Sequence, residues 1–172
     1  MARPPGRRDE NVIDRRMLLR AWGLMGPVSA ALTMGLFWLV LAHAGWTPGM
    51  PTGPGSPLHH TYLQATTASF AAIVACQVGT AFAARTQHSA LRRVGLLSNP
   101  LLLGGIAFEL AFAVAVVYLP PLQVLFGTAP LPLWAVALLV PMPVLVWGVD
   151  EAFRAVGRRR SRASTPAAGS PR

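Results

Sequence analysis

The sequence predicts an all-α integral membrane protein with four transmembrane helices and both termini in the cytoplasm. Hydrophobic residues make up 53% of the 172-residue chain, and only 12% of residues are charged. All 15 positive charges are arginines, and they form three clusters, at residues 3–20, 85–93 and 154–172. If the apolar stretches between them cross a bilayer four times, every cluster lies on the same side, as the positive-inside rule requires.

The composition also restricts the partners that we expect. A net charge of +9 is compatible with nucleic-acid binding. The clusters flank apolar spans, however, which favours contact with anionic lipid headgroups, so we expect a bilayer partner and no nucleic acid. The single cysteine, Cys76, excludes an internal disulfide and is expected to pack as a small apolar residue. Abundant Arg, Ala, Gly and Pro without Lys indicates a GC-rich bacterial source and hence the inner (plasma) membrane.

The first predicted span covers residues 21–44, after a basic cytoplasmic segment at residues 1–18. Pro27 is expected either to kink this helix or to mark its start. Ala42-His43-Ala44 has the small-x-small form of a signal-peptide cleavage site. The apolar run is much longer than a signal-peptide core, and three further spans follow, so a membrane anchor is the favoured interpretation.

The second predicted span covers residues 63–84 and follows an uncharged outer loop rich in Gly and Pro. Trp46 and Tyr62 flank this loop, as residues of an interfacial aromatic belt do. The span is weakly hydrophobic and contains many small and polar residues. Such a helix gains little from facing lipid, and we expect it to pack closely against other helices.

The third span is predicted at residues 100–119, after a short inner loop. Asn99 is expected to cap this helix, and Pro100 suits its first turn. Pro120-Pro121 should end it, because two prolines cannot continue the hydrogen-bond ladder. The connection that follows, up to Pro130, contains a semi-polar patch and is expected to lie along the membrane interface.

The fourth span is predicted at residues 131–149, with Trp134 as its outer anchor. Pro141 and Pro143 interrupt its middle, which lipid tolerates only if neighbouring groups or a local kink satisfy the freed carbonyls. The four-helix domain then covers residues 19–153. A basic, Ser/Ala/Pro/Gly-rich tail at residues 154–172 lacks the apolar content to fold and is expected to be disordered.

Glu109 is the only acidic residue within a span, near the predicted bilayer centre. Because an ionised carboxylate there costs at least about 2.5 kcal/mol, it is either a cation or proton ligand or a neutral acid bonded to a neighbouring helix. Gln77 is its expected partner, and Thr80 lies one turn further on the same face. A polar packing contact is the alternative interpretation of Gln77. We treat Glu109, Gln77 and Thr80 as candidate cation-binding residues.

An acidic pair, Asp150 and Glu151, lies at the inner membrane edge. Asp150 can meet Arg154 at i, i+4, which we interpret as a surface ion pair of little energetic value.

His59-His60, in the outer loop, forms a poor metal site without further ligands, so no metal is expected. The sequence has no phosphate-binding Gly loop, nucleophile elbow or H-E-x-x-H. We therefore expect no catalytic residue and no cofactor.

Several motifs occur in an order that resembles a known family. They are Ala65-Thr66-Thr67-Ala68-Ser69-Phe70, Ala75-Cys76-Gln77, Phe82-Ala83-Ala84-Arg85, Asn99-Pro100, Phe108-Glu109-Leu110, Tyr118-Leu119-Pro120-Pro121-Leu122-Gln123, Phe126-Gly127-Thr128-Ala129-Pro130-Leu131 and Val149-Asp150-Glu151. Together they resemble the last four helices, the seventh to the tenth, of P2-class cation-transporting P-type ATPases. The resemblance covers roughly residues 12–160. It implies that Gln77 and Glu109 contribute to, or lie beside, a cation site or proton path.

Two departures from the family pattern limit this implication. Some members carry an acid at or one turn after the position of Gln77, where this chain has Gln77 and Thr80, so the ion is not identified. Family pumps also bind ions mainly on earlier helices and phosphorylate the Asp of a D-K-T-G-T loop, which is absent from this sequence. Since phosphoryl transfer needs that nucleophile, Mg²⁺ ligands and a nucleotide cradle, we expect no ATP hydrolysis by this chain alone.

Three functions follow as hypotheses. The first is a membrane-support bundle of a P-type cation pump, on a separate or truncated chain that acts only with a catalytic core. The second is an independent four-helix membrane protein that forms homo-oligomers through its second span. The third is a small cation or proton channel built around Glu109.

Overall fold

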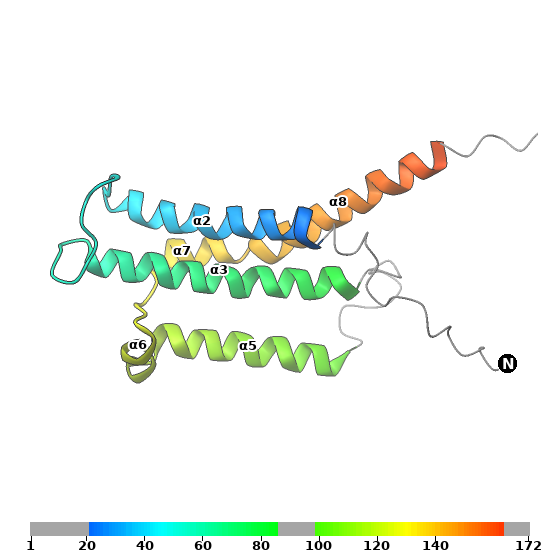
Figure 1. The fold of residues 1–172 in the computed structure, drawn as a ribbon. Coiled ribbons are helices and arrows are strands. Elements are labelled where there is room, and N and C mark those ends of the chain that lie inside the picture. Colours follow the sequence, from blue (N-terminus) through cyan, green and yellow to red (C-terminus); the bar gives the residue numbers. More distant parts are fainter. Residues whose placement is uncertain (1–20, 86–98, 164–172) are drawn as a thin grey trace, which may run out of the picture.

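A computed structural model describes residues 21–85 and 99–163, and every regular element in these two ranges is helical. The elements are η1 (Ala21–Met25), a π-helical turn, then α2 (Gly26–His43), α3 (His59–Arg85), α5 (Pro100–Tyr118), α6 (Pro120–Phe126), α7 (Leu133–Leu139) and α8 (Met142–Ala163). Four of the described segments are long and apolar enough to span a membrane, at residues 23–43, 59–84, 100–118 and 133–156. The predicted class and number of spans are thus confirmed (Figure 1).

Helix α3 is central to the bundle and contacts α2, α5, α7 and α8. Most of its buried positions carry small side chains: Ala65, Ala68, Ala72, Ala75, Cys76, Gly79 and Ala83. Thr67, Val74 and Val78 are buried as well. Half of its span is buried, compared with 17% for α5 and 22% for each of the other two spans. Small side chains allow backbones to approach closely, so the expectation that this span packs inside the bundle is confirmed.

The helix ends show how the prolines act. Pro27 lies in the first turn of α2, so it is near the start of the α-helix, and the π-helical turn η1 precedes it. The predicted cap of α5 is confirmed, since the Asn99 side chain accepts a hydrogen bond from the Leu102 N–H at 3.2 Å. Pro141 separates α7 from α8, so the fourth span is two helices rather than one kinked helix.

Two predicted boundaries differ from the structure. Helix α3 begins at His59, so the adjacent histidines belong to its first turn and not to the outer loop. Helix α8 continues to Ala163, so residues 154–163 are helical, whereas the sequence suggested a disordered tail there. The segment at residues 1–18, most of the inner loop and the end of the tail lie outside the described residues.

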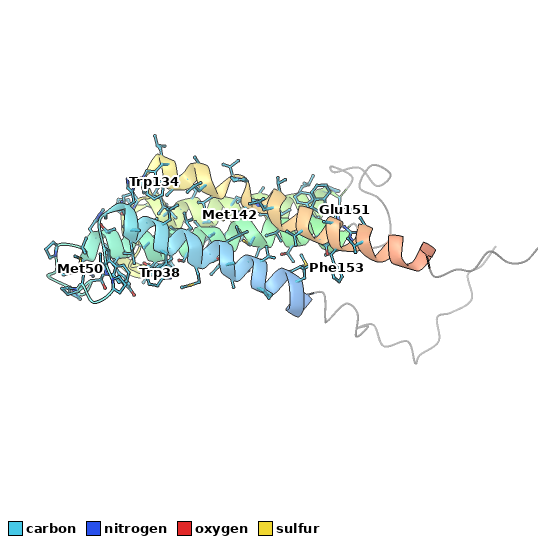
Figure 2. The ribbon with its side chains drawn as sticks, turned by 90° about the horizontal axis from the view of Figure 1, so that it is seen from above. Trp38, Met50, Trp134, Met142, Glu151 and Phe153 are labelled. Carbon is cyan, nitrogen blue, oxygen red and sulfur yellow. The ribbon has the colours of Figure 1, made fainter. Side chains whose placement is uncertain are left out.

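The two ends of the bundle differ in chemistry. Figure 2 shows Trp38, Met50 and Trp134 towards one end and Glu151 and Phe153 towards the other. Aromatic pairs link helices at the first end: the rings of Phe37 and Tyr62 are 6.2 Å apart, and those of His43 and Trp134 are 4.8 Å apart. Arg85 and Arg154 belong to the opposite end, where α3 finishes and α8 leaves the bundle (Figure 1).

Candidate functional site

Gln77 and Thr80 line a groove between α2 and α3. The groove has a volume of about 340 Å³ and is lined by Ser29, Ala30, Thr33, Met34, Ile73, Cys76, Gln77 and Thr80. Both Gln77 and Thr80 are exposed. The Thr80 hydroxyl donates to the carbonyl of Cys76 at 3.0 Å, whereas the Gln77 amide has no hydrogen-bond partner among the described residues. The Gln77 amide therefore faces outward from within the span at residues 59–84, and its hydrogen-bonding groups have no partner among the described residues.

The α2 side of the groove supplies two hydroxyl groups that the sequence analysis did not select. Ser29 and Thr33 are four residues apart, which places them on one face of α2. Ser29 lies beside Cys76 in this lining, and Cys76 is 3% exposed and belongs to the hydrophobic core of the bundle. The expected packing role of Cys76 is therefore confirmed. Two hydroxyl residues four positions apart in an apolar span are a sequence signal, and it could have predicted that Ser29 and Thr33 line a polar groove.

Glu109 lies elsewhere, on α5. It is half-buried and shares a helical stripe with Ala113, Val116 and Val117, the three buried residues of α5. Its carboxylate has no hydrogen-bond partner among the described residues. Around the neighbouring cavity, the residues that α3 contributes are Ala71, Val74, Ala75 and Val78, and none of them is polar. The structure therefore brings Gln77 and Thr80 together but does not form the expected pairing of Gln77 with Glu109.

The acidic pair, Asp150 and Glu151, differs from the expected surface pair. Arg154 Nε lies 3.1 Å from Asp150 Oδ2, and Arg154 Nη2 lies 2.8 Å from Glu151 Oε2. Asp150, however, is completely buried, while the side chain of Glu151 is 41% exposed. Asp150 follows Met142 and Val146 at four-residue intervals, so it continues the buried stripe of α8. The interpretation as a surface pair is therefore wrong for Asp150.

The histidine pair has a structural role at the start of α3. His59 Nδ1 lies 3.0 Å from the carbonyl oxygen of Thr52, and because a carbonyl only accepts, this nitrogen carries the proton. This contact ties the loop between α2 and α3 to the first turn of α3. Among the described residues, no group of three or more His, Cys, Asp or Glu side chains is arranged to hold a metal ion.

Residues 1–156 match the family model described as the C-terminus of cation-transporting ATPases. The chain belongs to this family. The resemblance noted from the motifs is thereby confirmed, and the four apolar helices identify a multi-pass membrane protein. In cation-transporting ATPases this domain is the membrane portion and not the catalytic part.

The geometry limits what this ATPase membrane domain can do chemically. The groove offers an amide and hydroxyls, which can hydrogen-bond a helix or supply neutral oxygens to a cation. It contains no carboxylate, and Glu109 is not among its lining residues. A cation held by these described residues alone would therefore lack a compensating negative charge, which favours helix docking over ion binding at the groove.

Proposed function

We propose that this bundle is the membrane-support domain of a cation-transporting P-type ATPase and acts by docking on a catalytic core outside residues 1–172. The family match supports the domain assignment. The Gln77 amide in the α2–α3 groove carries the docking argument. An amide facing hydrocarbon forfeits hydrogen bonds, whereas a docked helix restores them, so the polar groove is the preferred contact face.

The core is proposed to lie on a second polypeptide that carries D-K-T-G-T and the ion-binding helices. The bundle then anchors those helices while they move, and it supports transport without hydrolysing ATP itself. Glu109 remains a proposed minor contributor to the ion path, outside the groove. We further propose that the assembly resides in the bacterial inner membrane with the arginine-bearing end of the bundle in the cytoplasm.

Co-purification with a core chain tests the proposal. The tagged bundle is expressed together with a cation-ATPase chain that ends after its sixth span, and the pair is extracted in mild detergent. We expect the core to be retained and its ATPase activity to exceed that of the core alone. Failure of the core to co-purify, with crosslinked dimers of the tagged chain instead, would support the homo-oligomer hypothesis and reject docking.

Two alanines provide a matched steric test of the contact face. Ala30 is exposed and lines the groove, and Ala107 is exposed on α5. Ala30→Leu adds bulk where the partner helix should sit, so we expect it to reduce retention of the core at least about tenfold. Ala107→Leu adds the same bulk away from the groove and should leave retention unchanged. Equal effects of the two variants would argue against the groove as the docking face.

A further inference from the structure

Among the described residues, helix α5 is packed closely against the bundle at one end only. Its three buried residues, Ala113, Val116 and Val117, all lie in its outer half. None of residues 100–112 is buried, and Leu101 is 86% and Phe108 74% exposed. A helix held by packing at one end has few contacts that resist motion of the other.

Hydrogen bonds at the outer end replace those that prolines remove. Pro120 and Pro121 have no N–H, so the carbonyls of Val116 and Val117, four residues earlier, lose their helical partners. The Thr128 hydroxyl donates to the carbonyl of Val116 at 2.6 Å. The Gln123 amide donates to the carbonyl of Val117, also at 2.6 Å. Both orphaned carbonyls are thus satisfied by side chains of the segment that follows α5.

The same segment is tied to α3. The Ala129 N–H donates to the Thr67 hydroxyl at 2.9 Å in a buried setting, and that hydroxyl donates to the carbonyl of Leu63 at 2.6 Å. The Gln64 amide donates to the carbonyl of Pro130 at 2.9 Å. We call the four side chains that make these contacts, Gln64, Thr67, Gln123 and Thr128, the outer clasp. It joins the outer ends of α3 and α5 through the segment at residues 119–130.

The contact between α5 and its neighbouring helices leaves space into which α5 can move. A cavity of about 340 Å³ lies between α3, α5 and the α7–α8 segment. Its lining is apolar, with Val74 and Val78 on one side and Leu110 and Val114 on the other. Closing this space would bring apolar side chains into van der Waals contact and would break no polar contact. The cavity therefore permits α5 to approach α3 or to move away from it at little energetic cost.

We propose that α5 tilts about the outer clasp and that its inner half moves relative to α3, carrying Glu109 with it. Glu109 lies inward of the buried residues on the same stripe, so its carboxylate is on the moving side of the hinge. Tilting thus changes how far this carboxylate is enclosed by α3. The motion follows from the packing of α5 and does not depend on the proposed ATPase role.

Distances between paired spin labels test the hinge in phosphatidylcholine nanodiscs, in a chain carrying Cys76→Ser. The outer pair is His60 with Leu119, and the inner pair is Ala84 with Leu101. Ala84 with Ala152 on α8 is the control, since α3 and α8 are in extensive contact. All five labelled side chains are exposed. We expect the inner pair to show a distance distribution at least about twice as broad as the outer and control pairs.

The clasp itself is tested by Thr128→Val combined with Gln123→Leu. Loss of the two donors should broaden the distance distribution of the outer pair towards that of the inner pair. Thr66→Val should leave the distribution of the outer pair narrow. If, with the clasp unmodified, the distance distribution of the inner pair is as narrow as that of the control pair, the hinge is overturned. Because this measurement does not use the double variant, it tests the hinge even if that variant does not fold. Persistence of a narrow outer pair in a folded double variant would overturn the role of the clasp.

Discussion

Thr66 and Thr67 are adjacent on α3, and their hydroxyls form different kinds of hydrogen bond. Thr66 donates only to carbonyls of its own helix, at Tyr62 and Leu63. Thr67 donates to Leu63 and also accepts from the Ala129 N–H, 62 residues away. Because the Ala129 contact is buried, its loss leaves a backbone donor without a partner. The two residues therefore provide a comparison of local and tertiary hydrogen bonding at the same depth.

We expect Thr67→Val to lower the stability of the bundle by about 1 kcal/mol, the range measured for interhelical hydrogen bonds in membranes. Valine keeps the shape of threonine and removes the acceptor for the Ala129 N–H. Thr66→Val should change stability by less than half as much, since it removes only bonds within its own helix. Thermal unfolding midpoints in detergent measure both, and Thr67→Ser should restore most of the loss. Equal midpoints for the two valine variants would contradict the tertiary role of Thr67.

The sequence predicted that Asp150 lies at the surface, whereas the structure buries it completely. Its spacing from Arg154 predicted the ion pair, which the structure contains. Spacing along one helix does not report what packs against that helix, so the complete burial of Asp150 required the tertiary structure. The same limit applies to Gln77 and Thr80: their shared face was predictable, whereas the α2 hydroxyls opposite them depend on how α2 docks.

Asp150→Asn should destabilise the bundle by about 3 kcal/mol, because it removes the charge of a fully buried carboxylate beside a largely buried guanidinium. Glu151→Gln should cost less than about 1 kcal/mol, because that carboxylate is substantially exposed. The unfolding midpoints of the two variants, measured side by side in detergent, check this order. A larger loss for Glu151→Gln would show that Asp150 is not the dominant partner of Arg154.

At the scale of elements, the sequence predicted the four spans and the Asn99 cap because these depend on local composition. It placed the start of α3 too late, since the backbone bond from the His59 N–H to the Ser56 carbonyl already turns the chain before the histidines. The sequence also left open whether Pro141 kinks or breaks the fourth span. The structure contains a break, and the Pro141 carbonyl accepts from the Leu145 N–H to begin α8.

The contact between α3 and α8 depends on Gly79. A Cβ atom added at Gly79 would lie 2.5 Å from the carbonyl oxygen of Pro143, and backbone cannot move aside as a flexible side chain does. We therefore expect Gly79→Ala to cost about 1–3 kcal/mol, as overpacking typically does. Gly104→Ala on α5 is the matched control, since nothing lies within 4 Å of its added Cβ. Unfolding midpoints measure both, and a neutral Gly79→Ala would show that the two helices are farther apart.

For the whole molecule, the arrangement of charge and aromatic side chains predicts sidedness. The described arginines belong to one end of the bundle, and the pairs Phe37–Tyr62 and His43–Trp134 belong to the other, as the positive-inside rule and interfacial anchoring require. This pattern could be predicted from the sequence because every arginine lies outside the four spans predicted from it, the last of which ends at residue 149. Which membrane face each end occupies stays a prediction, because the helices alone do not fix the direction of insertion.

Single-cysteine labelling on intact cells measures that direction, in a chain carrying Cys76→Ser. Thr47→Cys places a thiol in the exposed outer loop, and Val156→Cys places one beyond the buried part of α8, where the native side chain is 51% exposed. We expect a membrane-impermeant maleimide to label Thr47→Cys directly and Val156→Cys only after permeabilisation, because arginine-rich segments are retained in the cytoplasm during insertion. The reverse result would invert the topology. It would also place the inner end of α5, which we propose to be mobile, on the outer face of the membrane.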